Sequence, residues 1–414
     1  MKQIVIISGI LLILLIYYLF FRNEYLFDFS EKRYNRKFWV LLVVFAIRLI
    51  AIYFTNGDVY VLLKLTETTI EKGYPYVAGL PTYVSYWSDH NPLDIYVCHP
   101  PLVFYIYSPV IALLGHGSMI FTTFLFLLSL HVIWNWFERN NKDPLIPCLL
   151  YGTFPLFYLE SLTHISMNIT LIAILSVGIT SYLDYEKSKD ISRLKKAVLC
   201  FALAPMIEYS AILFLGFFSI YFILREGFKS KAIIILFIIW LPFISWTLFT
   251  DFSVFHSYAF TYTREHHFDE NLPYGEAVRK YYSMHESAIF PYYFMDNEFF
   301  AFINFAIFLN GNLLLLGNRR GRGWNCVIFL TISTQLLLLT YYAVIGYQSH
   351  PLANFARYII PSAFLIVPFS LRTEFDNKWR LIAIALIILN IILNLILVVN
   401  GGFQWVTVRW VGPY

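Results

Sequence analysis

The chain has 414 residues, of which 59% are hydrophobic and only 14% are charged, and its mean hydropathy is +0.63. Soluble globular proteins carry charge on about a quarter of their residues. The apolar residues here come in blocks close to 20 residues long, the length that a helix needs to cross about 30 Å of hydrocarbon. An ordinary soluble domain is therefore excluded, and an all-α polytopic transmembrane bundle is predicted. A β-barrel would alternate apolar and polar residues over about ten positions, and this sequence does not.

The charge balance and the cysteines favour no other class. The net charge is only +4, and the positive residues are explained below by membrane topology, so no nucleic-acid partner is expected. No pair of the four cysteines has zinc-site spacing, and no disulfide framework is suggested. The chain also has no glycine-rich phosphate loop and no internal repeat of broken spans of the kind found in transporters.

In chain order, the hydrophobic blocks predict about 11–12 spans in a single integral membrane domain, residues 1–414. The first block ends at Arg22 instead of a small-residue cleavage site, which indicates a retained helix and not a signal peptide. Two short pieces are expected to be separated by a break near Pro205. The predicted spans are 3–21, 38–54, 118–137, 144–158, 164–182, 197–206 with 208–224, 232–250, 298–316, 325–345, 357–371 and 381–399.

The distribution of Lys and Arg predicts which loops face the cytoplasm. Of the 30 such residues, 21 fall in alternate short loops and 8 on the opposite side, with Arg48 inside a span. The two long loops, 55–117 and 251–297, both fall on the non-cytoplasmic side. The second is rich in Tyr, Phe and His, a composition typical of the headgroup zone.

The first long loop opens with an acidic, helix-forming segment. Val59, Leu62, Leu63, Thr66, Ile70 and Tyr74 recur at helical spacing, which predicts an amphipathic helix in the membrane interface. Asp58 stands immediately before that apolar stripe. A carboxylate there is either a helix-capping group or a general base held at the rim of the lipid, and the two roles are compatible.

The same loop continues with the "CHPPL" segment, residues 98–102. The two prolines hold the chain extended, and the apolar tail that follows is short for a span and suits a partly embedded or interfacial helix. His99 either makes a structural hydrogen bond or contacts a phosphate or a sugar hydroxyl.

Four other positions carry candidate chemistry. Glu160 and His164, four residues apart in "ESLTHISMN", are either an ordinary solvated pair or a second part of a site. Arg357 begins a late span on the outer side, where it either binds phosphate or extends to the interface. Arg48, inside its span, favours a structural partner over catalysis. A run of potential metal ligands is better explained as a solvated loop, and it comprises His266, His267, Asp269 and Glu270.

Taken together, these segments resemble the GT-C superfamily of integral membrane glycosyltransferases, which use sugars linked to polyprenyl phosphate. The likeness lies in an ordered set: "GDVY" with Asp58, "GYPY" ending at Tyr76, "HPPL" with His99, then "ESLTHISMN" and "ARYIIP" with Arg357 and Tyr358. The layout looks most like dolichyl-phosphate-mannose-dependent mannosyltransferases and their prokaryotic polyprenyl-phosphate-sugar relatives.

The resemblance implies a function and a role for each motif. Asp58 would be the catalytic base in an inverting transfer of a sugar, mannose by resemblance, to an acceptor hydroxyl on the non-cytoplasmic side. Arg357, His99, Tyr358 and Tyr76 would bind the lipid-phosphate sugar, and Glu160 with His164 would form a second-loop site. The partners implied are the polyprenyl-phosphate sugar, membrane lipid and an acceptor glycan, glycolipid or protein. The membrane would be the plasma membrane of a prokaryote or the ER membrane of a eukaryote.

Three departures from the family pattern leave alternatives open. The family usually has Tyr or Lys where His99 stands, an acid where Ser166 stands, and often Lys where Glu208 stands. Without the second acid, no cofactor is certain, and a divalent cation stays an open alternative. Two other functions remain: a transporter or flippase of lipid-linked saccharides, with Arg48, Asn135, Glu208 and Gln335 lining a path, and a non-catalytic subunit of a transferase complex.

Overall fold

The structure is a computed structural model, and it describes residues 2–21, 33–49, 57–76, 95–96, 99–154, 165–250, 252, 322–344 and 377–397. Within these residues the regular structure is helical, and the single β-bridge joins Tyr76 to Ile95. The helices are α1 (Lys2–Phe21), α2 (Arg33–Leu49), α3 (Gly57–Lys72), α5 (Leu102–Leu114), η1 (Gly115–Ser118), α6 (Met119–Arg139), α7 (Leu145–Thr153), α9 (Met167–Ser188), α10 (Ile191–Leu203), η2 (Ala204–Met206), α11 (Ala211–Glu226), α12 (Ser230–Phe249), α17 (Arg322–Val344) and α19 (Asn377–Leu397).

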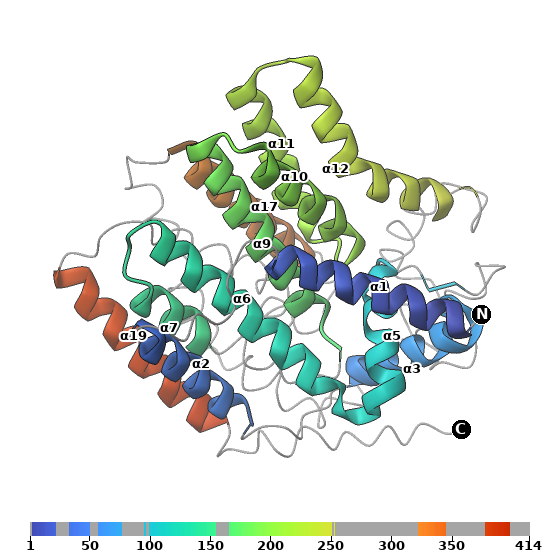
Figure 1. The fold of residues 1–414 in the computed structure, drawn as a ribbon, viewed down its shortest axis with the longest axis horizontal. Coiled ribbons are helices and arrows are strands. Elements are labelled where there is room, and N and C mark those ends of the chain that lie inside the picture. The colour runs from blue at the N-terminus through green and yellow to red at the C-terminus, as the bar shows by residue number, and fades with distance from the viewer. Residues whose placement is uncertain are drawn as a thin grey trace.

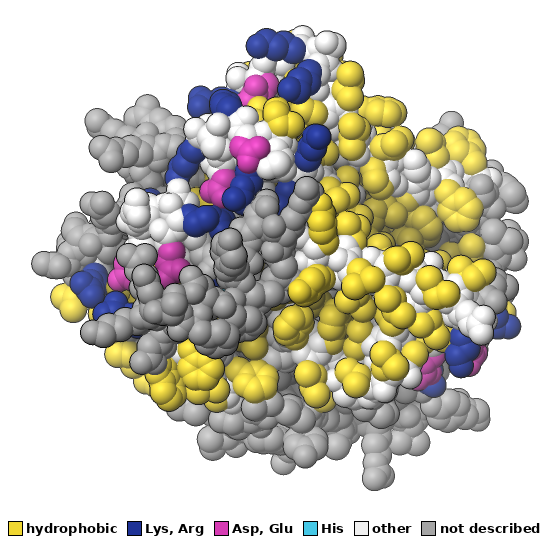
Figure 2. Space-filling view, viewed as in Figure 1, with side chains coloured by type: hydrophobic (Ala, Val, Ile, Leu, Met, Phe, Trp, Pro, Cys, Tyr) yellow, Lys and Arg dark blue, Asp and Glu magenta, His cyan; other side chains and the backbone are white. Residues whose placement is uncertain are grey.

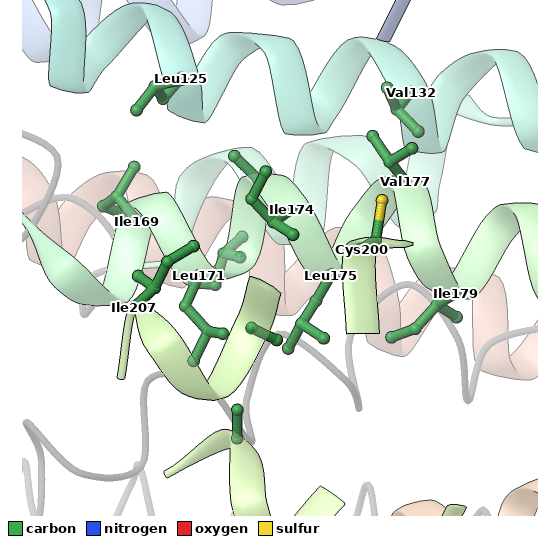
Figure 3. Packing of buried hydrophobic residues seen from close by; sticks show 14 of the residues in the cluster. Leu125, Val132, Ile169, Leu171, Ile174, Leu175, Val177, Ile179, Cys200 and Ile207 are labelled. Carbon is green, nitrogen blue, oxygen red and sulfur yellow. The ribbon is translucent and has the colours of Figure 1, made fainter. Parts of the chain in front are cut away.

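Helix α9 forms the centre of the bundle (Figure 1). It packs on α6 along one side and on α10 along another, and α12 and α11 follow beyond α10. Figure 3 shows Leu125 and Val132 of α6 directed toward α9, while Cys200 of α10 lies beside Val177. These side chains are 2% exposed or less. The core of the described part is therefore a helix-on-helix interface.

The predicted break near Pro205 is confirmed. Helix α10 ends at Leu203, a single 3-10 turn contains Pro205, and α11 begins at Ala211. Proline has no N–H to donate and its ring clashes with the preceding turn, so the α-helix cannot continue through it. The break redirects the chain and places Glu208 between the two helices.

Three described helices are long and apolar enough to cross a membrane: α6, α9 and α12. Shorter apolar stretches lie in α1, α5, α17 and α19. Helix α7 has nine residues, fewer than a crossing needs, and the predicted spans at 298–316 and 357–371 lie outside the described residues. The helical, membrane-type character of the prediction is thus supported, whereas the number of spans stays a prediction.

The two ends of the bundle differ in charge. Lys and Arg gather at the upper left of Figure 2, and apolar side chains cover its middle and right. A smaller group of both signs lies at the lower right edge of Figure 2. The basic end includes Arg139, Lys187, Lys189 and Arg193, and Arg139 pairs with Asp184 at 3.2 Å where α6 and α9 both finish. Helix α6 begins next to α5, so about 30 Å of helix separates α5 from this basic end.

The amphipathic helix predicted in the first long loop is present as α3. Leu62, Leu63 and Ile70 on its apolar stripe are buried, and the exposed face carries a Lys64–Glu67 ion pair at 2.7 Å. Helix α5, predicted as a short embedded or interfacial helix, packs against both α1 and α3. One long side of α5 is fully enclosed, which makes it part of the core.

Candidate functional site

Asp58 is the second residue of α3, so its backbone lies in the first helical turn. The first N–H groups of a helix have no partner within the helix, and the helix dipole favours a carboxylate there. The backbone is thus consistent with either predicted role, as a cap or as a base held by helix geometry. The side chain of Asp58 lies outside the described part of the structure, as does the link, residues 50–56, from α2.

The other end of α3 joins "GYPY" to "HPPL". Gly73 ends the helix with φ 94°, a left-handed conformation that favours glycine. The Tyr96 N–H donates to the Pro75 carbonyl at 2.8 Å, beside the Tyr76–Ile95 bridge. The Tyr105 hydroxyl of α5 then donates to the Gly73 carbonyl at 2.7 Å. Two segments that the sequence analysis treated as separate motifs are therefore held against one another.

His99 forms a hydrogen-bonded pair with Glu208, a residue predicted above only as part of a possible transport path and as a departure from the family pattern. The His99 Nδ1 lies 3.1 Å from a Glu208 carboxylate oxygen, and the two side chains are 24% and 12% exposed. His99 therefore makes a side-chain hydrogen bond, as one of its two predicted roles requires, and contact with a phosphate or a sugar hydroxyl stays a prediction.

One aromatic ring lies beside this pair, and others pack on residues next to the pair in the chain. The Tyr96 ring lies 6.0 Å from the His99 ring, centroid to centroid. Trp246, near the end of α12, donates from its indole N–H to the Tyr209 hydroxyl at 2.9 Å. Trp246 and Tyr74 both pack on Ile95. The end of α12, the break after α10 and the "HPPL" segment are thus brought to the C-terminal end of α3.

Asp58 and Tyr76 do not meet in one contact cluster. From Asp58 to the last residue of α3, Lys72, the helix rises by about 20 Å. The chain turns back after that end, and the Tyr76 backbone N–H donates to the Thr68 hydroxyl at 3.1 Å. Thr68 lies ten residues after Asp58, so about 15 Å of helix separates Tyr76 from the first turn.

The remaining predicted site residues are outside the described residues: Glu160, His164, Arg357, Tyr358 and the run from His266 to Glu270. The Arg48 and Gln335 side chains are outside them too. Within the described residues, no three metal-ligating side chains cluster. Ser166, where the family pattern has an acid, accepts from the Ile169 N–H at 3.1 Å and caps α9. Its position therefore has a structural explanation.

The polar residues proposed to line a transport path belong to separate clusters where they are described. Asn135 of α6 bonds Lys37 of α2, and its amide nitrogen lies 3.0 Å from a His131 ring nitrogen. Glu208 bonds His99. These contacts give the transport hypothesis no specific support.

Comparisons of the sequence with protein families and with curated proteins, and of the structure with solved structures, found no match. The functional argument for this chain therefore depends on its own residues.

Proposed function

We propose that the chain is a membrane glycosyltransferase that moves a sugar, mannose by resemblance, from a polyprenyl phosphate to an acceptor hydroxyl. The resemblance of its ordered motifs to GT-C enzymes motivates the proposal. The observation that carries it is the position of the Asp58 backbone in the first turn of α3, a helix that packs on α5. The helix dipole favours a carboxylate in a first turn.

In this reaction the acceptor oxygen attacks the anomeric carbon while the bond from that carbon to the lipid-phosphate oxygen breaks. Asp58 takes the proton of the acceptor hydroxyl, and the phosphate leaves with the electron pair of the broken bond. A single displacement inverts the anomeric centre. Arg357 is assigned to the phosphate, because an arginine fork matches its oxygens.

The proposal also assigns a membrane arrangement. The basic end of the bundle would face the cytoplasm, as the distribution of positive charge in multi-pass proteins favours. The α3–α5 end would then lie at the outer leaflet, in the plasma membrane of a prokaryote or the ER membrane of a eukaryote. A polyprenyl-linked sugar presented in that leaflet would reach Asp58 while its tail stays in the bilayer. Tyr76, beside Thr68 and about 15 Å along the helix from Asp58, would contact a substrate part remote from the reacting carbon.

Asp58→Asn tests the proposal directly. We expect sugar transfer from a radiolabelled polyprenyl-phosphate mannose to fall by about 10²–10⁴-fold, the range lost with a general base. Glu67→Gln is the matched control, because it makes the same change of charge on the exposed face of α3. Transfer at the wild-type rate by a folded Asp58→Asn protein would remove Asp58 as the base.

A further inference from the structure

His99 and Glu208 form an oriented acid–imidazole pair at the C-terminal end of α3. No other described residue hydrogen-bonds either side chain, and both keep some exposure, 24% and 12%. A neutral ring that donates from Nδ1 to the carboxylate keeps Nε2 as an acceptor, and a protonated ring donates from both nitrogens. The second carboxylate oxygen of Glu208 is also an acceptor. The pair therefore presents polar groups that match hydroxyls.

The chain segments that contain His99 and Glu208 hold the pair in place. His99 follows the strand-like contact between Tyr96 and Pro75 and precedes the two prolines. Glu208 lies in the turn after Pro205, where its own N–H donates to the Ala204 carbonyl at 3.2 Å. Neither residue is on a long flexible segment of the described chain. Little ordering is then needed when a ligand binds.

An aromatic ring lies beside His99, and a second aromatic side chain is bonded to the neighbour of Glu208. The Tyr96 ring faces His99 at a tilt of 33°, and Trp246 is anchored by its bond to Tyr209, the neighbour of Glu208. Tyr74 packs with Trp246 on Ile95. Binding sites for small molecules combine aromatic walls with a few fixed polar groups. Aromatic faces pack against the C–H face of a sugar ring, while hydroxyls at its edge bond carboxylate and imidazole.

The carboxylate of the pair favours a neutral ligand over an anionic one such as phosphate. The Glu208 carboxylate oxygen lies 3.1 Å from the imidazole, so a phosphate bound at the ring would meet a like charge. A neutral ligand with several hydroxyls has no such conflict. We propose that the His99–Glu208 pair, with Tyr96 and Trp246, is a binding site for a neutral saccharide.

Within the proposed transfer reaction, this saccharide is the acceptor glycan, and that assignment rests on the proposed function. The site is at the far end of α3 from Asp58, about 20 Å along the helix. It would therefore hold a sugar unit of the acceptor remote from the hydroxyl that reacts. Saccharide binding itself does not require that transfer occurs.

The test measures binding to the full chain in lipid nanodiscs by saturation-transfer NMR and calorimetry. The probes are methyl mannoside, linear manno- and gluco-oligosaccharides of two to four units, and inorganic phosphate. We expect one or more oligosaccharides to bind saturably. Glu208→Gln and His99→Gln are each expected to weaken that binding by about tenfold or more, as loss of hydrogen bonds to charged groups does. Glu67→Gln is the control and should bind like wild type.

Three results would overturn the inference: no saturable saccharide binding by folded wild type, binding unchanged in both variants, or phosphate binding that Glu208→Gln strengthens. Thermal unfolding shows which variants are folded. If one of Glu208→Gln and His99→Gln does not fold, the other still tests the inference. Asp58→Asn separates the two proposals, because it should abolish transfer and leave saccharide binding intact. If the wild-type chain binds saccharide through Glu208 but transfers no sugar, the transferase proposal is refuted and the saccharide site is retained.

Discussion

Helices α9 and α12 have similar lengths, 22 and 20 residues, yet their burial is opposite. In α9 the mean hydropathy is 1.4 and 89% of the apolar stretch is buried, whereas in α12 the mean hydropathy is 2.4 and only 11% is buried. A water-soluble protein places its most hydrophobic helix inside. In a bilayer the lipid tails are as apolar as leucine, so hydrophobicity does not drive a helix to the centre.

The central position of α9 comes from small and self-satisfied side chains. Thr170, Ser176 and Thr180 are buried, and each donates at 2.7 Å to a carbonyl of the same helix. Gly178 lets Phe201 of α10 approach closely. Such residues allow backbones to come together, which is how helices associate in membranes. Helix α12 instead exposes Ile234 and Phe237, by 58% and 59%.

The largest effect is expected from closing the gap at Gly178. A Cβ added there would lie 2.7 Å from Phe201 Cε1 and 2.9 Å from Cys200 Cβ, and both residues are fully buried. Gly178→Leu should cost about 3 kcal/mol of stability or more, because overpacking forces backbone shifts. Unfolding by SDS titration in mixed micelles, with the folded yield, measures the loss.

Gly216 of α11 is the matched control for Gly178. An added Cβ there meets no atom within 4 Å. Gly216→Leu should therefore change the free energy of unfolding by no more than about 1 kcal/mol. Equal losses in the two variants would show that the α9–α10 contact is not tighter than the rest of the bundle.

A smaller effect is expected from truncating an isoleucine on each helix. Ile172 of α9 is fully buried, and Ile172→Ala should cost about 2 kcal/mol. This is the low end of the range for buried isoleucine, because lipid supplies no transfer term and the lost packing remains. Ile234→Ala on α12 should cost less than about 0.5 kcal/mol, since the side chain is exposed. The same SDS titration gives both values, and a larger loss at Ile234 would reverse the comparison.

The sequence predicted the parts of the fold that local chemistry decides. The break at Pro205 follows from one residue, and the buried stripe of α3 follows from helical spacing. The start of α10 at Ile191 was predicted six residues too late. Lys195 and Lys196 lower the hydropathy of its first turns, although Asp190 caps the helix. Hydropathy predicted α9 and α12 alike as spans, and it did not indicate that α9, with its small residues, would lie at the centre of the bundle.

The candidate site was less predictable because its contacts are long-range. His99 and Glu208 are 109 positions apart, and no local pattern pairs them. The available signal was their chemistry: an acid beside the predicted break near Pro205, and a histidine beside two prolines in the first outer loop. The turn that brings Tyr76 back to Thr68 is also a tertiary feature that helical spacing does not predict.

The smallest effect on the free energy of unfolding is expected from changing Asp190, between α9 and α10. The start of α12 offers the comparison. One carboxylate oxygen of Asp190 accepts from the Ser192 backbone N–H at 2.9 Å, and the other accepts from the Ser192 hydroxyl at 2.8 Å. The backbone hydrogen bond and then the hydroxyl lower the pKa of Asp190 below its ordinary value. Lys229, the N-cap residue of α12, makes no side-chain capping hydrogen bond.

Because the folded pKa of Asp190 is lowered, its stabilising effect is present above the unfolded pKa of about 3.9 and is lost as the pH falls through the folded value. Asp190→Asn keeps a capping oxygen but removes the titration. The difference in unfolding free energy between wild type and this variant should therefore shrink between about pH 5 and pH 2. Glu71→Gln, an exposed amide substitution on α3, corrects for general charge effects. A difference that stays constant across this range would mean that the charge of Asp190 contributes nothing to the α9–α10 junction, and that its capping oxygen alone distinguishes this junction from the start of α12.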